Sequence, residues 1–218
     1  MFNSPSLANC DLTRLDEQLN EMSAGGVDFF HIDLIDGHYV NNLGFPPRII
    51  SDIKKRYPQI ITDVHLMVTE PISYVSTMQE CGADFVCFHT DTRFVIRTLK
   101  AYHDAGMKAG IVLNPSQCIE SILPYLSYVD MVVMMAVEPG FAGQSYLPET
   151  TQRVRELCKL RNKLNLDFLI SVDGGVNHTI GRQLKKIGVD VIVGTIHNIF
   201  QQPDGLEAAC KSFKSTLG

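Results

Sequence analysis

Eight short apolar runs alternate with eight longer amphipathic stretches along this chain, and this alternation constrains the fold more than any other feature. Strands that alternate with helices form parallel sheets, and eight such units can close into a barrel. We therefore predict an α/β fold, a single-domain (β/α)8 TIM barrel over residues 1–218. The predicted strands are 4–7, 27–34, 60–67, 84–88, 108–113, 129–135, 168–173 and 190–194. The predicted helices are 11–24, 46–57, 71–81, 93–105, 117–127, 147–165, 178–187 and 204–216.

An open, doubly wound sheet is the main alternative fold. Such a sheet would carry a glycine fingerprint after its first strand, where this chain has Ser6-Leu7-Ala8-Asn9. Capping residues support the predicted helices, because Asp11 precedes the first one, and Gly106 and Gly188 follow the fourth and the seventh. No linker, low-complexity segment or change in composition divides the chain, which favours one domain.

Composition excludes several classes of partner. The formal net charge of −5 leaves no basic surface of the kind that binds nucleic acid. The six cysteines are scattered without a C-x-x-C pair, which is typical of reduced thiols in a cytosolic protein. The first residues do not resemble a signal peptide, and no apolar run approaches the length of a membrane span. We expect a cytoplasmic homo-oligomer that binds a small molecule, without nucleic-acid or membrane partners.

The predicted second strand carries polar residues on one of its faces. Side chains alternate between the two faces of a strand, so Phe29, His31, Asp33 and Ile35 share a face. A histidine and an aspartate on the buried face of an apolar strand must be satisfied by partners. A metal ion would satisfy them, and so would a hydrogen-bond network.

Further polar residues occur where later strands end. His65 lies near the end of the third strand and Asp173 at the end of the seventh. Active-site groups of such barrels lie at the carboxyl-terminal ends of the strands. With His31 and Asp33, these residues form a four-ligand set that suits one divalent ion of zinc, manganese, iron or cobalt per chain. Each histidine taken alone is more often a hydrogen-bonded core residue, and Asp36 and His38 are best interpreted as turn residues.

Glycine-rich turns follow the last three strands. They are residues 139–144, residues 173–177 and the pair Gly194-Thr195. Backbone N–H groups converge on an anion in such turns, and barrels often hold phosphate after strands seven and eight. Three such turns at adjacent strand ends indicate a phosphorylated ligand. Met67 and Met135 end strands near the same rim, where a methionine either fills the core or shields a reaction from water.

Seven segments in series resemble the ribulose-phosphate 3-epimerase family. They are SPSL, HIDLIDGHYV, DVHLMVTEP, GADFVCFH, KAGIVLNP, VEPGFAGQSYLPE and VDGGVN, and they span nearly the whole chain. The resemblance implies a (β/α)8 barrel with a divalent metal on His31, Asp33, His65 and Asp173. It also implies that Asp33 and Asp173 are the two acid/base groups. The residues that it places against the substrate are Ser6, His65, Met67, Met135, Gly140, Phe141, Ala142, Gly143, Gly174, Gly175, Gly194 and Thr195.

The activity that the resemblance implies is the interconversion of D-ribulose 5-phosphate and D-xylulose 5-phosphate. Inversion at C3 requires proton removal on one face of the sugar and proton return on the other, through an enediolate. Two carboxylates on different strands suit that chemistry, and a metal stabilises the negative charge that develops on oxygen. Glycine-rich turns would hold the phosphate so that both faces of C3 meet a carboxylate.

The chain departs from the family pattern at several positions. Ile35 replaces a methionine, Ala142 replaces a glycine, and the segment Gly194–Phe200 is two residues longer than the usual ending. The longer segment keeps open a sister activity, in which D-allulose 6-phosphate is converted to fructose 6-phosphate. A metal-dependent hydrolase and a non-catalytic sugar-phosphate-binding barrel are further alternatives. A decarboxylase or aldol-lyase barrel is disfavoured because the segment 33–36 has no lysine.

Overall fold

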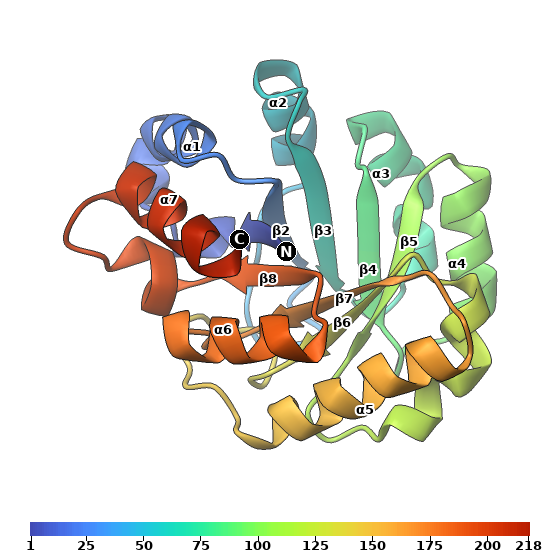
Figure 1. Ribbon diagram of the computed structural model, residues 1–218. Coiled ribbons are helices and arrows are strands. Elements are labelled where there is room, and N and C mark those ends of the chain that lie inside the picture. Colours follow the sequence, from blue (N-terminus) through green and yellow to red (C-terminus); the bar gives the residue numbers. More distant parts are fainter.

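The computed structural model describes residues 1–218, and helical segments surround a barrel of eight strands (Figure 1). The strands are β1 (Phe2–Pro5), β2 (Phe29–Ile35), β3 (Ile61–Met67), β4 (Phe85–His89), β5 (Lys108–Leu113), β6 (Met131–Met135), β7 (Leu169–Asp173) and β8 (Val191–Gly194). The α-helices are α1 (Leu15–Ala24), α2 (Arg48–Arg56), α3 (Val75–Cys81), α4 (Val95–Asp104), α5 (Glu149–Lys163), α6 (His178–Ile187) and α7 (Leu206–Leu217). Every predicted strand is present, with its ends within two residues of the predicted positions.

All neighbouring strands are parallel, and their order is β1-β8-β7-β6-β5-β4-β3-β2. β1 and β2 stand at the two ends of this order, and a parallel bridge between Ser6 and His31 joins them. The prediction of a (β/α)8 barrel is therefore confirmed. Because parallel strands share one direction, the residues that follow them gather at a single rim.

The two faces of β2 show how a strand serves both the barrel interior and the helices. Phe30, Ile32 and Leu34 belong to the large apolar cluster between the sheet and the helical layer. Phe29 belongs to a smaller cluster inside the barrel, where its ring centroid lies 5.9 Å from that of Phe85. Polar residues, among them the fully buried His31, occupy the next inward positions. The barrel interior thus contains an apolar layer, followed along the strands by a polar layer.

The predicted helix at 117–127 differs from the observed structure. Residues Ile119–Tyr128 form a 3-10 helix, η4, with Pro124 inside it. Proline has no N–H to donate, and its ring clashes with the preceding turn of an α-helix. The predicted helices at 11–24 and 71–81 likewise begin as 3-10 segments, η2 (Leu12–Arg14) and η3 (Pro71–Tyr74). These differences concern helix geometry and leave the strands in place.

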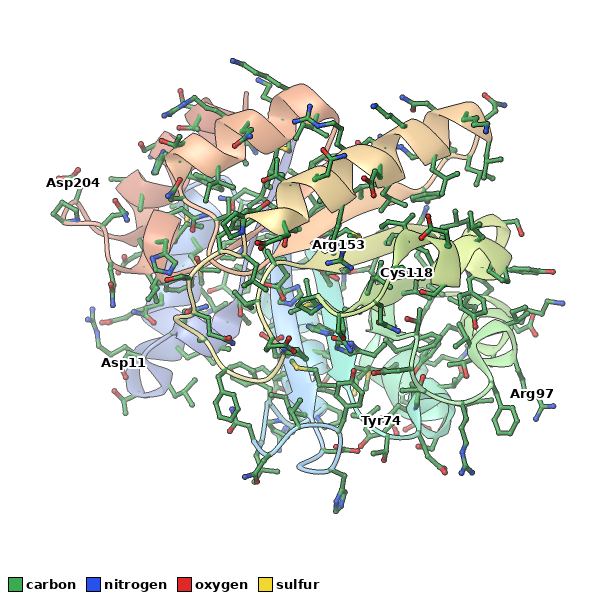
Figure 2. The ribbon with its side chains drawn as sticks, turned by 90° about the horizontal axis from the view of Figure 1, so that it is seen from below. Asp11, Tyr74, Arg97, Cys118, Arg153 and Asp204 are labelled. Atoms are coloured by element: carbon green, nitrogen blue, oxygen red, sulfur yellow. The ribbon has the colours of Figure 1, made fainter.

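Charged side chains lie on the outside of the helical layer. Asp11, Arg97 and Asp204 project from the periphery in Figure 2. Within α6, Leu184 is buried whereas the basic residues of the last turn, Lys185 among them, are exposed. No helix combines the length and the apolar composition that would be needed to cross a lipid bilayer.

Candidate active site

The four residues predicted to bind a metal lie together at the carboxyl-terminal rim of the barrel. His31 and Asp33 come from β2, His65 comes from β3, and Asp173 is the last residue of β7. One ligand atom from each residue lies within 4.8 Å of the corresponding atoms of the other three. Asp33 stands opposite His65 in the register of β2 and β3. Residues that are up to 142 positions apart in the sequence thus surround one point.

Two imidazole nitrogens and two carboxylate oxygens face that point. His31 Nε2 lies 3.4 Å from Asp33 Oδ1 and 3.7 Å from Asp173 Oδ2. His65 Nδ1 lies 3.3 Å and 3.8 Å from the same two oxygens. Both nitrogens are buried and neither has a hydrogen-bond partner. Unpaired buried polar atoms are costly, and a divalent cation would accept both lone pairs together with the two carboxylates. The donor set therefore fits one divalent metal ion.

Each of the two histidines has a second buried partner, which sequence reasoning missed. Asp63 Oδ2 lies 2.8 Å from His31 Nδ1, and His89 Nε2 lies 2.9 Å from His65 Nε2. Both partners are fully buried. The signal was available, because Asp63 precedes His65 by two positions on an apolar strand and His89 ends the apolar strand β4. Outer partners of this kind orient metal-ligating imidazoles.

Burial and neighbouring charges act against each other in this cluster. Burial disfavours the His31 imidazolium, but Asp33 and Asp63 outweigh burial and raise the pKa of His31 well above its usual range. Burial favours the neutral form of Asp33, but His31 and His65 outweigh it and hold the pKa of Asp33 below its usual range. For Asp173, burial prevails and, with the nearby Asp33 carboxylate, raises the pKa. The two carboxyl groups therefore titrate differently.

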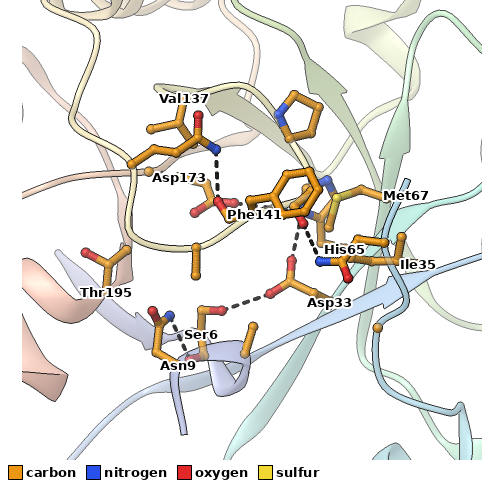
Figure 3. Close-up of a pocket in the computed structure, with 18 of the residues that line it drawn as sticks. Ser6, Asn9, Asp33, Ile35, His65, Met67, Val137, Phe141, Asp173 and Thr195 are labelled. Atoms are coloured by element: carbon orange, nitrogen blue, oxygen red, sulfur yellow. Dashed lines mark hydrogen bonds and ion pairs between the residues drawn. The ribbon is translucent and has the colours of Figure 1, made fainter. Parts of the chain in front are cut away.

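A pocket of about 440 Å³ opens above the cluster, and Asp33, His65 and Asp173 line it (Figure 3). Ser6, which was expected to contact substrate, also lines the pocket. Its hydroxyl donates a hydrogen bond of 2.8 Å to Asp33 Oδ2, so Ser6 also orients that carboxylate. Asn9, which was not predicted, lines the pocket and donates from Nδ2 to the Ser6 carbonyl.

Apolar side chains form part of the wall near the cluster. Met67, Met135 and Ile35 all line the pocket, as the alternation along their strands predicts. Met134 points the other way and belongs to the cluster beneath the helices. Ile35 therefore occupies the wall position at which the family pattern has a methionine.

The glycine-rich turns lie along another side of the pocket. The lining residues among those predicted are Gly140, Phe141, Ala142, Gly143, Gly174, Gly175 and Thr195. Gly174 and Gly175 have φ angles of +114° and +62°, and a Cβ on Gly175 would stand 2.3 Å from the Tyr146 nitrogen. Gly194 does not line the pocket, because it packs beneath Ile199, whose Cδ1 would stand 2.4 Å from a Cβ on Gly194. Its substitution would disturb packing.

The longer segment after β8 forms a π-helical turn, η5 (Ile196–Phe200). Thr195 and Asn198 cap it reciprocally, since the Thr195 hydroxyl accepts from His197 N and Asn198 Oδ1 accepts from Thr195 N. The turn brings His197 to the pocket wall, where Nε2 lies 3.2 Å from the Gln144 carbonyl oxygen. The pocket lining contains no lysine or arginine. An anion there would depend on backbone N–H groups and on His197.

Asp36 has a structural role in the turn after β2, as the sequence suggested. Its carboxylate accepts hydrogen bonds from the backbone N–H groups of His38, Tyr39 and Thr69. These bonds outweigh the opposing effect of burial and lower the pKa of Asp36 to about 2. His38 is exposed, and neither residue lines the pocket.

Comparison with known structures shows how widespread this fold is. The chain superposes on 3-hexulose-6-phosphate synthase from Salmonella typhimurium with a TM-score of 0.73 and 14% sequence identity, covering 100% of this chain and 98% of that one. It superposes on phosphoribosyl anthranilate isomerase from Thermus thermophilus with a TM-score of 0.69 and 12% identity, covering 100% and 98%. At these identities the likeness concerns the barrel fold alone.

Sequence comparison is more specific. Residues 3–199 match the Ribulose-phosphate 3 epimerase family. The chain is 34% identical over 215 residues to ribulose-phosphate 3-epimerase from Aquifex aeolicus, covering 98% of this chain and 96% of that relative. It is 35% identical over 206 residues to ribulose-phosphate 3-epimerase from Escherichia coli, covering 92% and 89%. The resemblance inferred from the motifs is confirmed, and the chain belongs to the ribulose-phosphate 3-epimerase family.

Proposed function

We propose that the protein is a metal-dependent 3-epimerase that interconverts D-ribulose 5-phosphate and D-xylulose 5-phosphate. The observation that carries this proposal is the pair of carboxylates, Asp33 and Asp173, at one pocket beside two unpartnered imidazole nitrogens. They come from β2 and β7, three positions apart around the barrel. Two acid/base groups that approach a substrate from different strands suit a reaction that inverts one carbon centre.

His31, Asp33, His65 and Asp173 would hold one divalent ion of zinc, manganese, iron or cobalt. Bound there, the ion would act as a Lewis acid that stabilises negative charge next to the reacting carbon. The two imidazoles would present His31 Nε2 and His65 Nδ1, the two nitrogens that lack other partners.

The protons move through the two aspartates. One carboxylate removes the proton from C3 to give an enediolate, and the other carboxyl group delivers a proton to the opposite face of C3. Each aspartate alternates between acid and base, depending on the direction of the reaction. The Ser6 hydroxyl, at 2.8 Å from Asp33 Oδ2, keeps that carboxylate in one orientation.

Apolar side chains would exclude water from the reacting carbon. Met67, Met135 and Ile35 line the pocket with the aspartates. A dry environment strengthens the electrostatic interactions of the site and limits the loss of the transferred proton to solvent. We assign to these three side chains a shielding role.

The phosphate would bind at the glycine-rich turns. Gly143, Gly174, Gly175 and Thr195 line the same pocket as the aspartates. The backbone N–H groups of the three glycines can surround an anion without a side-chain cation, in keeping with the lack of lysine and arginine in the lining. The N–H group of Thr195 already donates to Asn198 Oδ1. His197 would supply a side-chain contact at this end of the pocket.

The sister substrate D-allulose 6-phosphate is a second candidate, favoured by the π-helical turn. This turn adds residues at the phosphate end, where a displaced anion site would admit a sixth carbon. We expect turnover of both sugars, with ribulose 5-phosphate preferred. A side-by-side measurement of kcat/KM decides the assignment, and a higher value for allulose 6-phosphate would reverse it.

A coupled epimerase assay tests the activity. Metal-free protein is reconstituted separately with zinc, manganese, iron or cobalt and is assayed on ribulose 5-phosphate with and without a chelator. We expect metal-dependent turnover and, in deuterated water, incorporation of label at C3. Binding without turnover would identify a sugar-phosphate-binding barrel, and release of inorganic phosphate would identify a hydrolase.

A further inference from the structure

His89 has no role in the steps described so far, although it touches a proposed metal ligand inside the barrel. On the basis of the function proposed above, we propose that His89 is a positioning residue that fixes the tautomer of His65. In that tautomer Nε2 of His65 carries the proton and Nδ1 presents a lone pair to the metal. Asn114 and Tyr39 would hold His89 in place.

The contact between the two histidines is close and fully buried. His89 ends β4 and has no solvent exposure, and its ring centroid lies 5.0 Å from that of His65. The two Nε2 atoms lie 2.9 Å apart. When two neutral imidazoles share a hydrogen bond, one nitrogen donates and the other accepts. The direction of this hydrogen bond therefore determines which tautomer His65 adopts.

The surroundings of the pair favour one direction. If His65 donates from Nε2, His89 accepts at Nε2 and must carry its own proton on Nδ1. That Nδ1 atom is buried without a hydrogen-bond partner, and so is Asn114 Oδ1. The Asn114 side chain is a neighbour of this pair, because its Nδ2 donates to the Oη of Tyr39, whose ring lies against that of His89. An amide oxygen can only accept a hydrogen bond. Asn114 Oδ1 would therefore accept the proton of a protonated His89 Nδ1 and could not donate to a bare Nδ1.

The orientation of the Asn114 amide is itself determined by its neighbours. Its Nδ2 donates to Tyr39 Oη at 2.8 Å and to Asp91 Oδ2 at 3.1 Å, which leaves Oδ1 on the side away from these acceptors. Its backbone carbonyl accepts from Arg153, which reaches in from α5 (Figure 2). Tyr39 also stacks on His89, with ring centroids 4.5 Å apart. The amide thus cannot turn over without losing two hydrogen bonds.

The tautomer of His65 depends on the surroundings of its partner more than the tautomer of His31 does. His31 faces the Asp63 carboxylate, which can only accept and therefore places the proton on Nδ1 unaided. The partner of His65 is an imidazole, which can either donate or accept. Before a metal binds to Nδ1 of His65, the neighbours of His89 therefore bear on which of the two arrangements forms.

Three variants test the assignment through the affinity for Zn²⁺ alone, measured on metal-free protein by competition with a chelator. His89→Phe keeps a planar ring but removes the acceptor, and we expect a loss of about 10- to 100-fold. His89→Gln places an amide oxygen near the position of Nε2 and should recover most of that loss. Phe88→Leu, on the outer face of the same strand, controls for general loosening and should leave the affinity unchanged. Equal affinities of wild type and His89→Phe, or equal losses in His89→Phe and Phe88→Leu, would overturn the proposal.

A spectroscopic measurement on the unmodified protein keeps the proposal testable if His89→Phe does not fold. Long-range ¹H–¹⁵N spectra of the metal-free and of the zinc-loaded protein, labelled at histidine, distinguish protonated from bare ring nitrogens. We expect a proton on Nε2 of His65 and on Nδ1 of His89. A proton on Nε2 of His89 would refute the tautomer assignment. Neither measurement uses a sugar phosphate, so an inactive protein with the expected tautomers would contradict the epimerase proposal alone.

Discussion

The carboxylate of Asp63 offers the sharpest quantitative test of how the barrel supports its proposed metal site. Asp63 is fully buried, and its Oδ2 lies 2.8 Å from His31 Nδ1. Its other oxygen has no partner, so the His31 contact is its main interaction. Loss of an outer partner of a metal-ligating histidine costs about 10- to 100-fold in metal affinity. That range corresponds to about 1.4 to 2.7 kcal/mol.

Two substitutions of Asp63 should lower the metal affinity by amounts at opposite ends of this range. In Asp63→Asn the amide oxygen can still accept from Nδ1 of His31, so only the charge is lost and we expect about tenfold weaker binding. In Asp63→Ala the Nδ1–H group is left buried without an acceptor, which costs roughly 1–3 kcal/mol. The alanine variant should therefore bind metal about 100-fold more weakly than the wild type.

The assay is a competition titration of metal-free protein with Zn²⁺ and a chelator, with the thermal unfolding of each protein recorded in parallel. Ser171→Ala is the matched control, because Ser171 is a buried residue of β7, across the barrel from β3, and its hydroxyl has no partner. Its Zn²⁺ affinity should equal that of the wild type. Affinities of both Asp63 variants within twofold of the wild type, or a weaker effect of alanine than of asparagine, would refute the reasoning.

Four further outcomes are expected. Elemental analysis should find one divalent ion per chain, and removal of that ion by a chelator should abolish turnover; full activity of metal-free protein would exclude the proposed site. Asp33→Asn and Asp173→Asn should each abolish epimerisation while the circular dichroism spectrum stays unchanged. Metal content must be measured in both variants because an amide is a poorer ligand, and near-normal turnover of either variant would disprove the two-base mechanism. Deletion of Ile196 and His197 should shift the kcat/KM ratio towards ribulose 5-phosphate, by about tenfold for each 1.4 kcal/mol of phosphate binding regained relative to allulose 6-phosphate. An unchanged ratio would show that the π-helical turn does not determine the substrate preference. Asp36, with a pKa of about 2 against an ordinary 3.8, stabilises the fold above pH 4, and this contribution is lost as the pH falls towards 2. In chemical denaturation, the free energy of unfolding of Asp36→Asn should therefore fall less between pH 4 and pH 2 than that of the wild type, and an identical fall would contradict this assignment.

The sequence alone was sufficient for the architecture and for the centre of the site. Strand alternation is a local property, so the inward direction of His31 and Asp33 follows from their spacing in an apolar run. The rim position of His65 and Asp173 follows from the barrel topology, which the eightfold alternation predicts. The same local pattern separates Met135, which lines the pocket, from Met134, which packs beneath the helices.

Only the tertiary structure decided which side chains meet across the barrel. The hydroxyl of Ser6 reaches Asp33 because β1 and β2 close the barrel, and His89 reaches His65 because β4 lies beside β3. Gly194, expected at the phosphate, packs under Ile199 and does not line the pocket. Such contacts depend on strand register, closure and side-chain rotamers. These are properties of the whole barrel, since each is selected by packing between segments distant in sequence, and no local period specifies them.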